Sequence, residues 1–406
     1  MKTLALVFAL FLSAFSFAQN RTLTGKIVSE QGVPLPYANV IVKNYNLGTV
    51  SNGNGHFKLI VPPQLQSDSL AVTFIGYKKQ SYKISELSDN ATIILKQNSF
   101  DLAEVSITAL SAEAIIATAL EKVSDNYNME GYKADGFYRV QSKREEQTIH
   151  LSEAVFQLYQ SKNSRPHQQL NLKKIRSVKD EKGSEGMDLG LTPEGIYTYD
   201  VVQHADNFNL LTKKGIKNHR FKLQGSEMVN GALAYKISFD QANDKFSGYK
   251  GTMYVDKETF AFVYFKIGKS PKGMEHNVYG GLMLRTVLAI MGLDIEMNKN
   301  NVSISYQKFN GKYYLNNVVN TTQLHFDNES DGYKFDADIR VDYLITKVND
   351  AKTEPFDSHE VVSKNRLLQT QSNDYSSNYW DDYNIILPTE DYETIAKRIH
   401  LRNAEK

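Results

Sequence analysis

Residues 24–97 limit the possible fold more than any other part of this 406-residue chain. Short runs rich in β-branched and aromatic residues alternate there with Gly, Pro, Asn and Asp at close, regular spacing. This alternation is typical of a small β-sandwich, in which short strands are joined by tight turns. The strands that it predicts cover 22–28, 38–43, 56–61, 69–75, 80–84 and 91–96.

Four motifs in this stretch resemble a known module. They are TGKI (24–27), PLPYANV (34–40), SNGNGHF (51–57) and FIGY (74–77). Together they resemble the carboxypeptidase-like regulatory domain of the Bacteroidetes type, over residues 22–97 or so. The resemblance implies a transthyretin-like β-sandwich in an exported protein. It implies no reaction, because this module is an appendage of the enzymes after which it is named.

Residues 1–18, MKTLALVFALFLSAFSFA, have the form of a secretory signal peptide. Lys2 supplies the basic start, an apolar run follows, and Ser16 and Ala18 are the small residues that a signal peptidase reads. The apolar run is too short to span a bilayer, which disfavours a membrane anchor. We therefore expect an exported mature chain that begins near Gln19 and lies in the periplasm or at the outer membrane.

Composition excludes several classes of protein. The chain has no cysteine, which rules out disulfides and a bacterial lipoprotein, whose lipid is attached to a Cys. Its 47 basic and 46 acidic residues become 46 and 46 once Lys2 is removed. No dense basic stretch is present, so a nucleic-acid partner is not expected. No run of the mature chain is long and apolar enough to predict a transmembrane helix.

The rest of the chain divides into a linker (98–110), a second domain (111–350) and a C-terminal tail (351–406) with a short helix after Pro388. The linker resembles the segment that follows the same module in TonB-dependent outer-membrane receptors. About 300 residues follow it, fewer than a plug and a receptor barrel need. The pattern Gly-x-Met-Tyr-Val-Asp-x-Glu-Thr at 251–259 resembles the half-barrel of LolA-like lipoprotein carriers, over about 130–350.

A helix followed by antiparallel strands is expected in the second domain. Ser111 can cap a helix over 111–126, whose apolar face should pack against the sheet that follows. The polar stretch 161–190 predicts loops and short strands. Hairpins are expected around 230–231, 256–259 and 310–311, and the Asn-Gly pair of the last is the strongest short hairpin signal. Strands at 324–326 and 335–345 continue the meander.

Segment 279–296, YGGLMLRTVLAIMGLDIE, is the most apolar part of the mature chain. Its apolar run of about 13 residues is too short to cross a membrane. One interpretation is a helix that lies over the sheet as part of the core. The other is a Met-containing flap over an apolar cavity that holds a lipid or acyl chain, since Met adapts to varied ligands.

A zinc carboxypeptidase would need a His-x-x-Glu pair, a second His and another Glu as general base. His150 and Glu153 have this spacing, and His276 lies 123 residues further on. However, 148–159 alternates like a strand, which would point His150 and Glu153 to opposite faces. Motifs for a nucleophile elbow, a phosphate-binding loop and a His-Glu-x-x-His zinc site are absent from the sequence. We predict no catalytic, cofactor or metal residues.

Weaker candidates each have a structural alternative. The Asn-Gly turn at 52–55 could bind a cation or be a plain turn, and 183–186 is a polar turn. Asp381 and Asp382 could be glycosidase acids or part of a solvated loop. The aromatic residues near them could stack on sugars or pack the tail onto the domain; they are Tyr375, Tyr379, Trp380 and Tyr383.

These patterns predict a mainly β protein, with an N-terminal transthyretin-like β-sandwich followed by a curved antiparallel β-sheet domain with a few helices. The expected function is non-enzymatic binding or scaffolding in the cell envelope, with a hydrophobic ligand enclosed by the sheet and 279–296. Two alternatives remain open. One is a hydrolase of envelope or dietary polymers, and the other is a protein–protein interaction module of an outer-membrane system.

Overall fold

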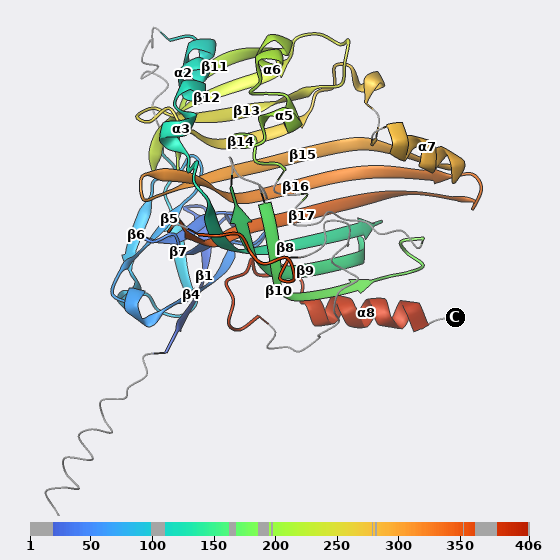
Figure 1. Cartoon of the computed structure of the whole chain (residues 1–406). Coiled ribbons are helices and arrows are strands. Elements are labelled where there is room, and N and C mark those ends of the chain that lie inside the picture. Colours follow the sequence, from blue (N-terminus) through green and yellow to red (C-terminus); the bar gives the residue numbers. More distant parts are fainter. Residues whose placement is uncertain are drawn as a thin grey trace, which may run out of the picture.

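The fold is described from a computed structural model of the chain (Figure 1). It describes residues 19–98, 110–161, 168–185, 195, 198–277, 279–280, 282–351, 353–361 and 380–404. The predicted signal peptide and nearly all of the predicted linker lie outside these ranges. The predicted domain limits at 97, 110 and 350 stay a prediction.

The N-terminal module is the predicted sandwich of two small sheets. One sheet has the order β4-β1-β7 and the other β3-β2-β5-β6. Its strands are β1 (Arg21–Ser29), β2 (Asn39–Val42), β3 (Gly48–Val50), β4 (His56–Val61), β5 (Ser69–Thr73), β6 (Gln80–Lys83) and β7 (Ala91–Leu95), with 3-10 turns at Pro63–Leu65 and Ile84–Glu86. All six predicted strands are confirmed. The three-residue β3 was missed, because so short a run carries no alternation.

A ten-stranded antiparallel sheet forms the second part, with the order β10-β9-β8-β17-β16-β15-β14-β13-β12-β11. The mainly β, curved-sheet fold class is thus confirmed. Its strands are β8 (Tyr132–Arg144), β9 (Gln147–Gln160), β10 (Gln168–Lys179), β11 (His219–Val229), β12 (Ala232–Gln241), β13 (Tyr249–Asp256), β14 (Phe262–Lys269), β15 (Leu293–Phe309), β16 (Lys312–Asn328) and β17 (Tyr333–Asn349).

The three predicted hairpins are present. Asn230-Gly231 and Asn310-Gly311 all have positive φ, between 47° and 81°, which is the geometry that tight two-residue turns require. Two expectations were wrong. The polar stretch 161–190 contains the twelve-residue β10, whose alternation is interrupted by a bulge at Leu172/Lys174. Residues 324–326 are part of the seventeen-residue β16 and not a separate strand.

Helices cover one face of this sheet at the β11–β14 end. They include α2 (Ala112–Glu121), α3 (Val123–Asn126), α5 (Ala205–Phe208) and α6 (Lys213–Asn218) (Figure 1). Ser111 caps α2 as predicted, because its hydroxyl accepts the N–H of Ala114 at 3.1 Å. Ile115 and Ile116 of α2 are buried in the large core together with Phe265 of the sheet. The helix predicted over 111–126 and its packing on the sheet are therefore confirmed.

The remaining helices lie elsewhere. They are the 3-10 turn η4 (Met274–His276), α7 (Leu282–Ile290) and α8 (Tyr392–Ala404). The C-terminal helix was predicted, and Asp391, just before it, caps it by accepting the N–H of Thr394 at 3.0 Å. Ile395 and Ile399 of α8 pack against Leu151 of β9. Of the helices in the described ranges, none has the length and apolar content that a bilayer crossing requires.

Three strands extend past their neighbours and form an arm. β14 pairs with β15 only as far as Asn301, and β8 pairs with β17 only from Asp338 onward. Residues 293–297, 324–328 and 333–337 therefore pair only among themselves. Figure 1 shows this arm projecting from the body, with α7 beside its far end.

Phe265 is a suitable probe of the large core. It is fully buried, stacks on Phe262 at 5.6 Å and meets Tyr306 edge-on at 6.3 Å. We expect Phe265→Ala to lower the free energy of unfolding by about 3–5 kcal/mol, because it removes buried apolar surface and leaves a cavity. Phe265→Leu should cost clearly less. Urea denaturation measures both, and a loss below about 1 kcal/mol for the alanine variant would contradict this packing.

Candidate functional site

A continuous row of paired residues crosses one face of the ten-stranded sheet. Paired residues of antiparallel strands point to the same side, so the members of the row share one face. From β11 to β10 they are Lys222, Ser238, Thr252, Lys266, Ser303, Val319, Asp342, Arg139, Glu153 and Arg176. The parallel row on the opposite face is apolar and belongs to the large core, with Ile237, Met253, Phe265, Ile304, Val318 and Tyr343 among its members.

Glu153 lies at the buried end of this row, between two arginines. Its carboxylate accepts hydrogen bonds from Arg139 at 2.5 Å and from Arg176 at 2.6 Å. The indole N–H of Trp380 donates to the same carboxylate at 3.3 Å. Burial by itself would raise the pKa of Glu153, but the two guanidinium groups outweigh it and hold the pKa below its usual value. The C-terminal segment (residues 380–404) completes the cluster, since Arg139 also donates to the carbonyl of Ile386 at 2.8 Å.

A second polar cluster joins the N-terminal module to β17. The Tyr37 hydroxyl donates to Asp342 at 3.1 Å, and Arg340 donates to the same carboxylate at 3.0 Å and to the Tyr37 hydroxyl. Burial, followed by the nearby Asp342 charge, raises the pKa of Tyr37, which stays a neutral donor. Tyr37 has a φ of 62°, an uncommon conformation for a residue with a Cβ that the surrounding contacts must hold in place.

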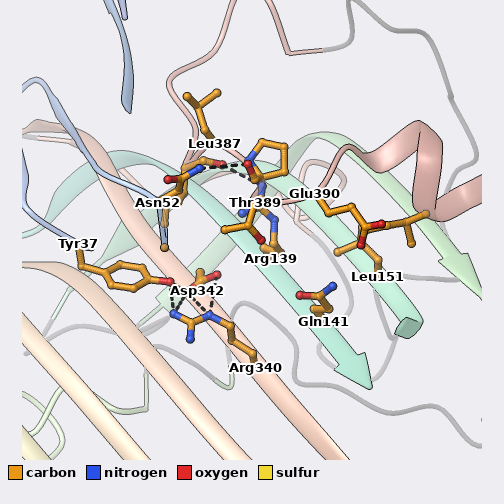
Figure 2. A pocket seen from close by; sticks show the side chains of 14 residues that line it. Tyr37, Asn52, Arg139, Gln141, Leu151, Arg340, Asp342, Leu387, Thr389 and Glu390 are labelled. Atoms are coloured by element: carbon orange, nitrogen blue, oxygen red, sulfur yellow. Dashed lines mark hydrogen bonds and ion pairs between the residues drawn. The ribbon is translucent and has the colours of Figure 1, made fainter. Parts of the chain in front are cut away.

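Between these clusters lies a small polar cavity of about 40 Å³ (Figure 2). Its walls come from the module (Tyr37, Asn52), from the sheet (Arg139, Arg340) and from the C-terminal segment (Thr389). A cavity of this size holds one or a few water molecules and is far smaller than a typical ligand site. The cavity is therefore too small for a substrate. It belongs to the region where the N-terminal module, the sheet and the C-terminal segment meet, which we call the joint.

Apolar packing supports this joint. Phe137 and Trp380 meet edge-on with ring centroids 6.1 Å apart, and Val50 of the module is buried with them. The C-terminal segment is also bound to the module directly. Asn52 donates to the carbonyl of Pro388 at 3.1 Å, and Asn384 accepts the N–H of Ile60 at 2.6 Å.

The three zinc candidates are not brought together. β9 is a strand, as expected, and His150 contacts the Ser152 hydroxyl at 2.8 Å on the face opposite to Glu153. Glu153 is occupied by its two arginines. His276 lies in η4, where it neighbours Glu275 at 3.6 Å. Among the described residues, no group of three or more His, Asp or Glu is arranged to hold a metal ion.

The other candidates have structural roles. Asn52 organises its turn, because its side-chain oxygen accepts the N–H groups of Asn54 and His56 at 3.0 and 2.9 Å. Asp381 and Asp382 are exposed, and Trp380 is buried, as the packing interpretation predicts. Tyr383 is half-buried and packs against the same cluster. Gly186, Tyr375 and Tyr379 lie outside the described residues.

The prediction that 279–296 is core was wrong. The segment does contain a helix, α7, but most of its described apolar side chains are exposed. Leu282, Met283 and Ile290 are 80%, 84% and 80% exposed. Leu288 is the described member of α7 that packs against the large core, and the chain enters β15 at Leu293. The reason is the position of α7 beside the projecting arm, where none of the described segments forms a second layer over it.

Comparison with known proteins identifies the first module. Residues 23–107 match the family of the CarboxypepD_reg-like domain, which confirms the resemblance drawn from the four motifs. The N-terminal part of the chain is therefore a carboxypeptidase regulatory-like domain.

Curated relatives share this region. A stretch of 102 residues is 35% identical to TonB-dependent receptor SusC of Bacteroides thetaiotaomicron, covering 25% of this chain and 10% of the receptor. A TonB-dependent receptor of Formosa agariphila is 28% identical over 106 residues, covering 26% of this chain and 10% of that protein. The chain thus spans about a tenth of the length of these relatives.

Solved structures similar to the larger part are distant. An outer-membrane lipoprotein-sorting protein domain from Vibrio parahaemolyticus is 12% identical, with a TM-score of 0.26 over 58% of this chain and 91% of that one. A LolA superfamily protein from Nitrosomonas europaea is 10% identical, with a TM-score of 0.22 over 63% of this chain and 99% of that one. The LolA type predicted for 130–350 is thus found among the neighbours, at scores too low to establish a common fold.

Sequence reasoning missed the residues of the joint. Their partners are far apart in the chain, 14 residues for Arg139 and Glu153 and 305 for Tyr37 and Asp342. One signal was available, because Arg139 and Glu153 are charges directly beside the apolar runs 136–138 and 154–156. A charge in such a place is rarely buried unless it is paired.

Glu153→Gln tests the buried cluster. The variant leaves Arg139 and Arg176 buried without an anion, so we expect a loss of about 3–5 kcal/mol in the free energy of unfolding at pH 7. The pKa of Glu153 is lowered in the folded state, so its contribution is present above the unfolded value and is lost as pH falls below about 4.3.

Urea denaturation of both proteins across pH 3–7 measures this contribution. The difference in stability between them should shrink as the pH falls through the folded-state pKa. Glu390→Gln, which removes an exposed ion pair with Arg398, is a matched control and should change little. A pH-independent difference for Glu153→Gln would contradict the assignment.

Proposed function

We propose that this is an exported, non-enzymatic binding or scaffolding protein of the bacterial envelope, which attaches to a lipid surface through α7. The exposure of α7 is the observation that supports this most. A helix that is apolar around most of its circumference is normally buried in a core or in a membrane. α7 is exposed instead, so water covers apolar surface that a lipid surface would cover in its place.

The length of α7 favours a position at the membrane interface. Nine residues extend about 13 Å, less than half of the roughly 30 Å hydrocarbon core. A short apolar helix of this kind can enter the boundary between headgroups and acyl chains. The arm of β15–β17 holds it beside the far end of the sheet, away from the N-terminal module (Figure 1).

Two further observations support a location in the cell envelope. The first 18 residues have the form of a signal peptide, and the relatives of the N-terminal module are TonB-dependent receptors. The exposure of α7 favours attachment to a lipid surface over a lipid enclosed between the sheet and 279–296. The small cavity of Figure 2 is lined by other elements, and α7 contacts the core through Leu288 while most of its described apolar side chains are exposed.

Vesicle flotation tests the attachment. The variant Leu282→Ser, Met283→Ser, Ile290→Ser removes three exposed apolar side chains and should weaken binding to phospholipid vesicles at least about tenfold. A matched control is Val33→Ser, Leu401→Ser, which removes apolar side chains that are 58% and 59% exposed in other parts of the molecule.

The control should float with vesicles as the unmodified chain does. Equal flotation of the α7 variant, or no flotation of the unmodified chain, would overturn the proposal. Thermal unfolding of each variant shows whether a loss of binding comes from a loss of folding.

A further inference from the structure

The row that crosses the sheet is covered along one half and open along the other. The N-terminal module and the C-terminal segment cover it over β17, β8, β9 and β10, where the joint lies. Over β11 to β15 the same face forms an open groove of about 670 Å³. This volume is in the range of sites that bind small organic ligands.

Four cations line the groove without an anion of their own. Arg220, Lys222, Lys250 and Lys266 are all exposed, and none of them forms an ion pair with a described residue. The acidic residue among the lining side chains, Asp240, is paired with Lys272 at 2.8 Å. In the covered half, by contrast, each arginine of the two clusters is paired with Glu153 or Asp342. The open half therefore carries a net positive charge that a ligand would have to balance.

The cations lie at intervals across strands β11 to β14. Lys222 and Lys266 belong to the same row and are three strands apart, or about 14 Å at the usual spacing between strands. Lys250 and Arg220 belong to the neighbouring row. A ligand that contacts Lys222 and Lys266 together needs anionic groups separated by a comparable distance, so a single small ion cannot satisfy both.

Hydroxyl groups lie between the cations, on a groove whose remaining surface is largely apolar. Ser238, Thr252 and Ser303 are half-buried members of the row and offer hydroxyl groups to the groove. The side-chain oxygen of Asn301 lies over Gly268, 2.6 Å from where a Cβ would be, so the amide of Asn301 also lines the groove. Hydroxyl and amide groups between cations are suited to a ligand that has hydroxyl groups between anionic ones.

We propose that this groove binds an acidic oligosaccharide through its carboxylate or sulfate groups. The row that carries the cations has no aromatic residue that could stack on nucleic-acid bases. Phe221 and Phe239 line the groove from the neighbouring row, with their side chains packed on the core. A flat membrane cannot follow a hollow surface. Moreover, α7 packs on the core side through Leu288, so a membrane that α7 touches lies away from the groove.

The test uses the mature chain and a sulfated, uronic-acid-containing hexasaccharide as the probe. Calorimetric titration at low salt should detect binding, and Lys222→Gln, Lys266→Gln should lower the affinity at least about tenfold. The double variant should also flatten the dependence of affinity on salt, because two fewer counterions are released. Lys222→Arg, Lys266→Arg keeps the charges and should retain binding.

The matched control is Lys213→Gln, Lys214→Gln, which removes two exposed lysines from α6 on the other side of the sheet. It should bind within about twofold of the unmodified chain, a difference below 0.5 kcal/mol or so. Three results would overturn the proposal: equal loss in this control, equal binding of a neutral hexasaccharide, or equal binding of poly-glutamate of the same charge. The last would show a general attraction for polyanions, acidic peptides included.

Discussion

The carboxylate of Glu153 is the interaction on which the arrangement of this protein depends. A buried carboxylate and two buried guanidinium groups are costly to remove from water, and good geometry is needed to offset that cost. Arg139, Glu153 and Arg176 come from three adjacent strands, so they lie in line when the sheet is in register. Trp380 and the carbonyl of Ile386 complete their hydrogen bonds, which holds the C-terminal segment on the sheet. That segment in turn binds the regulatory-like domain through Asn52 and Ile60.

This joint gives the two faces of the sheet different roles. One face is the apolar core under α2, α3, α5 and α6, and it continues to the arm where α7 lies. The other face is polar, and the joint covers only half of it. The open half carries cations that form no ion pair with a described residue, whereas α7 beside the arm carries apolar side chains that are exposed. The fold thus presents two surfaces of different chemistry, a basic groove and an apolar helix, on opposite sides of one sheet.

Local signals in the sequence were sufficient for much of this fold. The regulatory-like domain was recognised from four motifs, and the hairpins at 230–231 and 310–311 from Asn-Gly pairs that favour positive φ. Features that depend on distant partners were not predictable. One interpretation of the sequence placed α7 in the core, because apolar helices are usually buried. Its own residues could not indicate that none of the described segments lies over it. The basic groove was missed because its four cations come from three strands and never form a dense basic run.

Labelling of arginine side chains with phenylglyoxal, read by mass spectrometry, tests this account most directly. Arg139 and Arg176 are buried under the joint, whereas Arg220 is exposed in the groove of the same face. The account predicts that Arg220 reacts readily in the native protein, and that Arg139 and Arg176 react only after denaturation. Comparable labelling of all three in the native protein would show that the C-terminal segment and the regulatory-like domain do not cover the sheet, and would contradict the account.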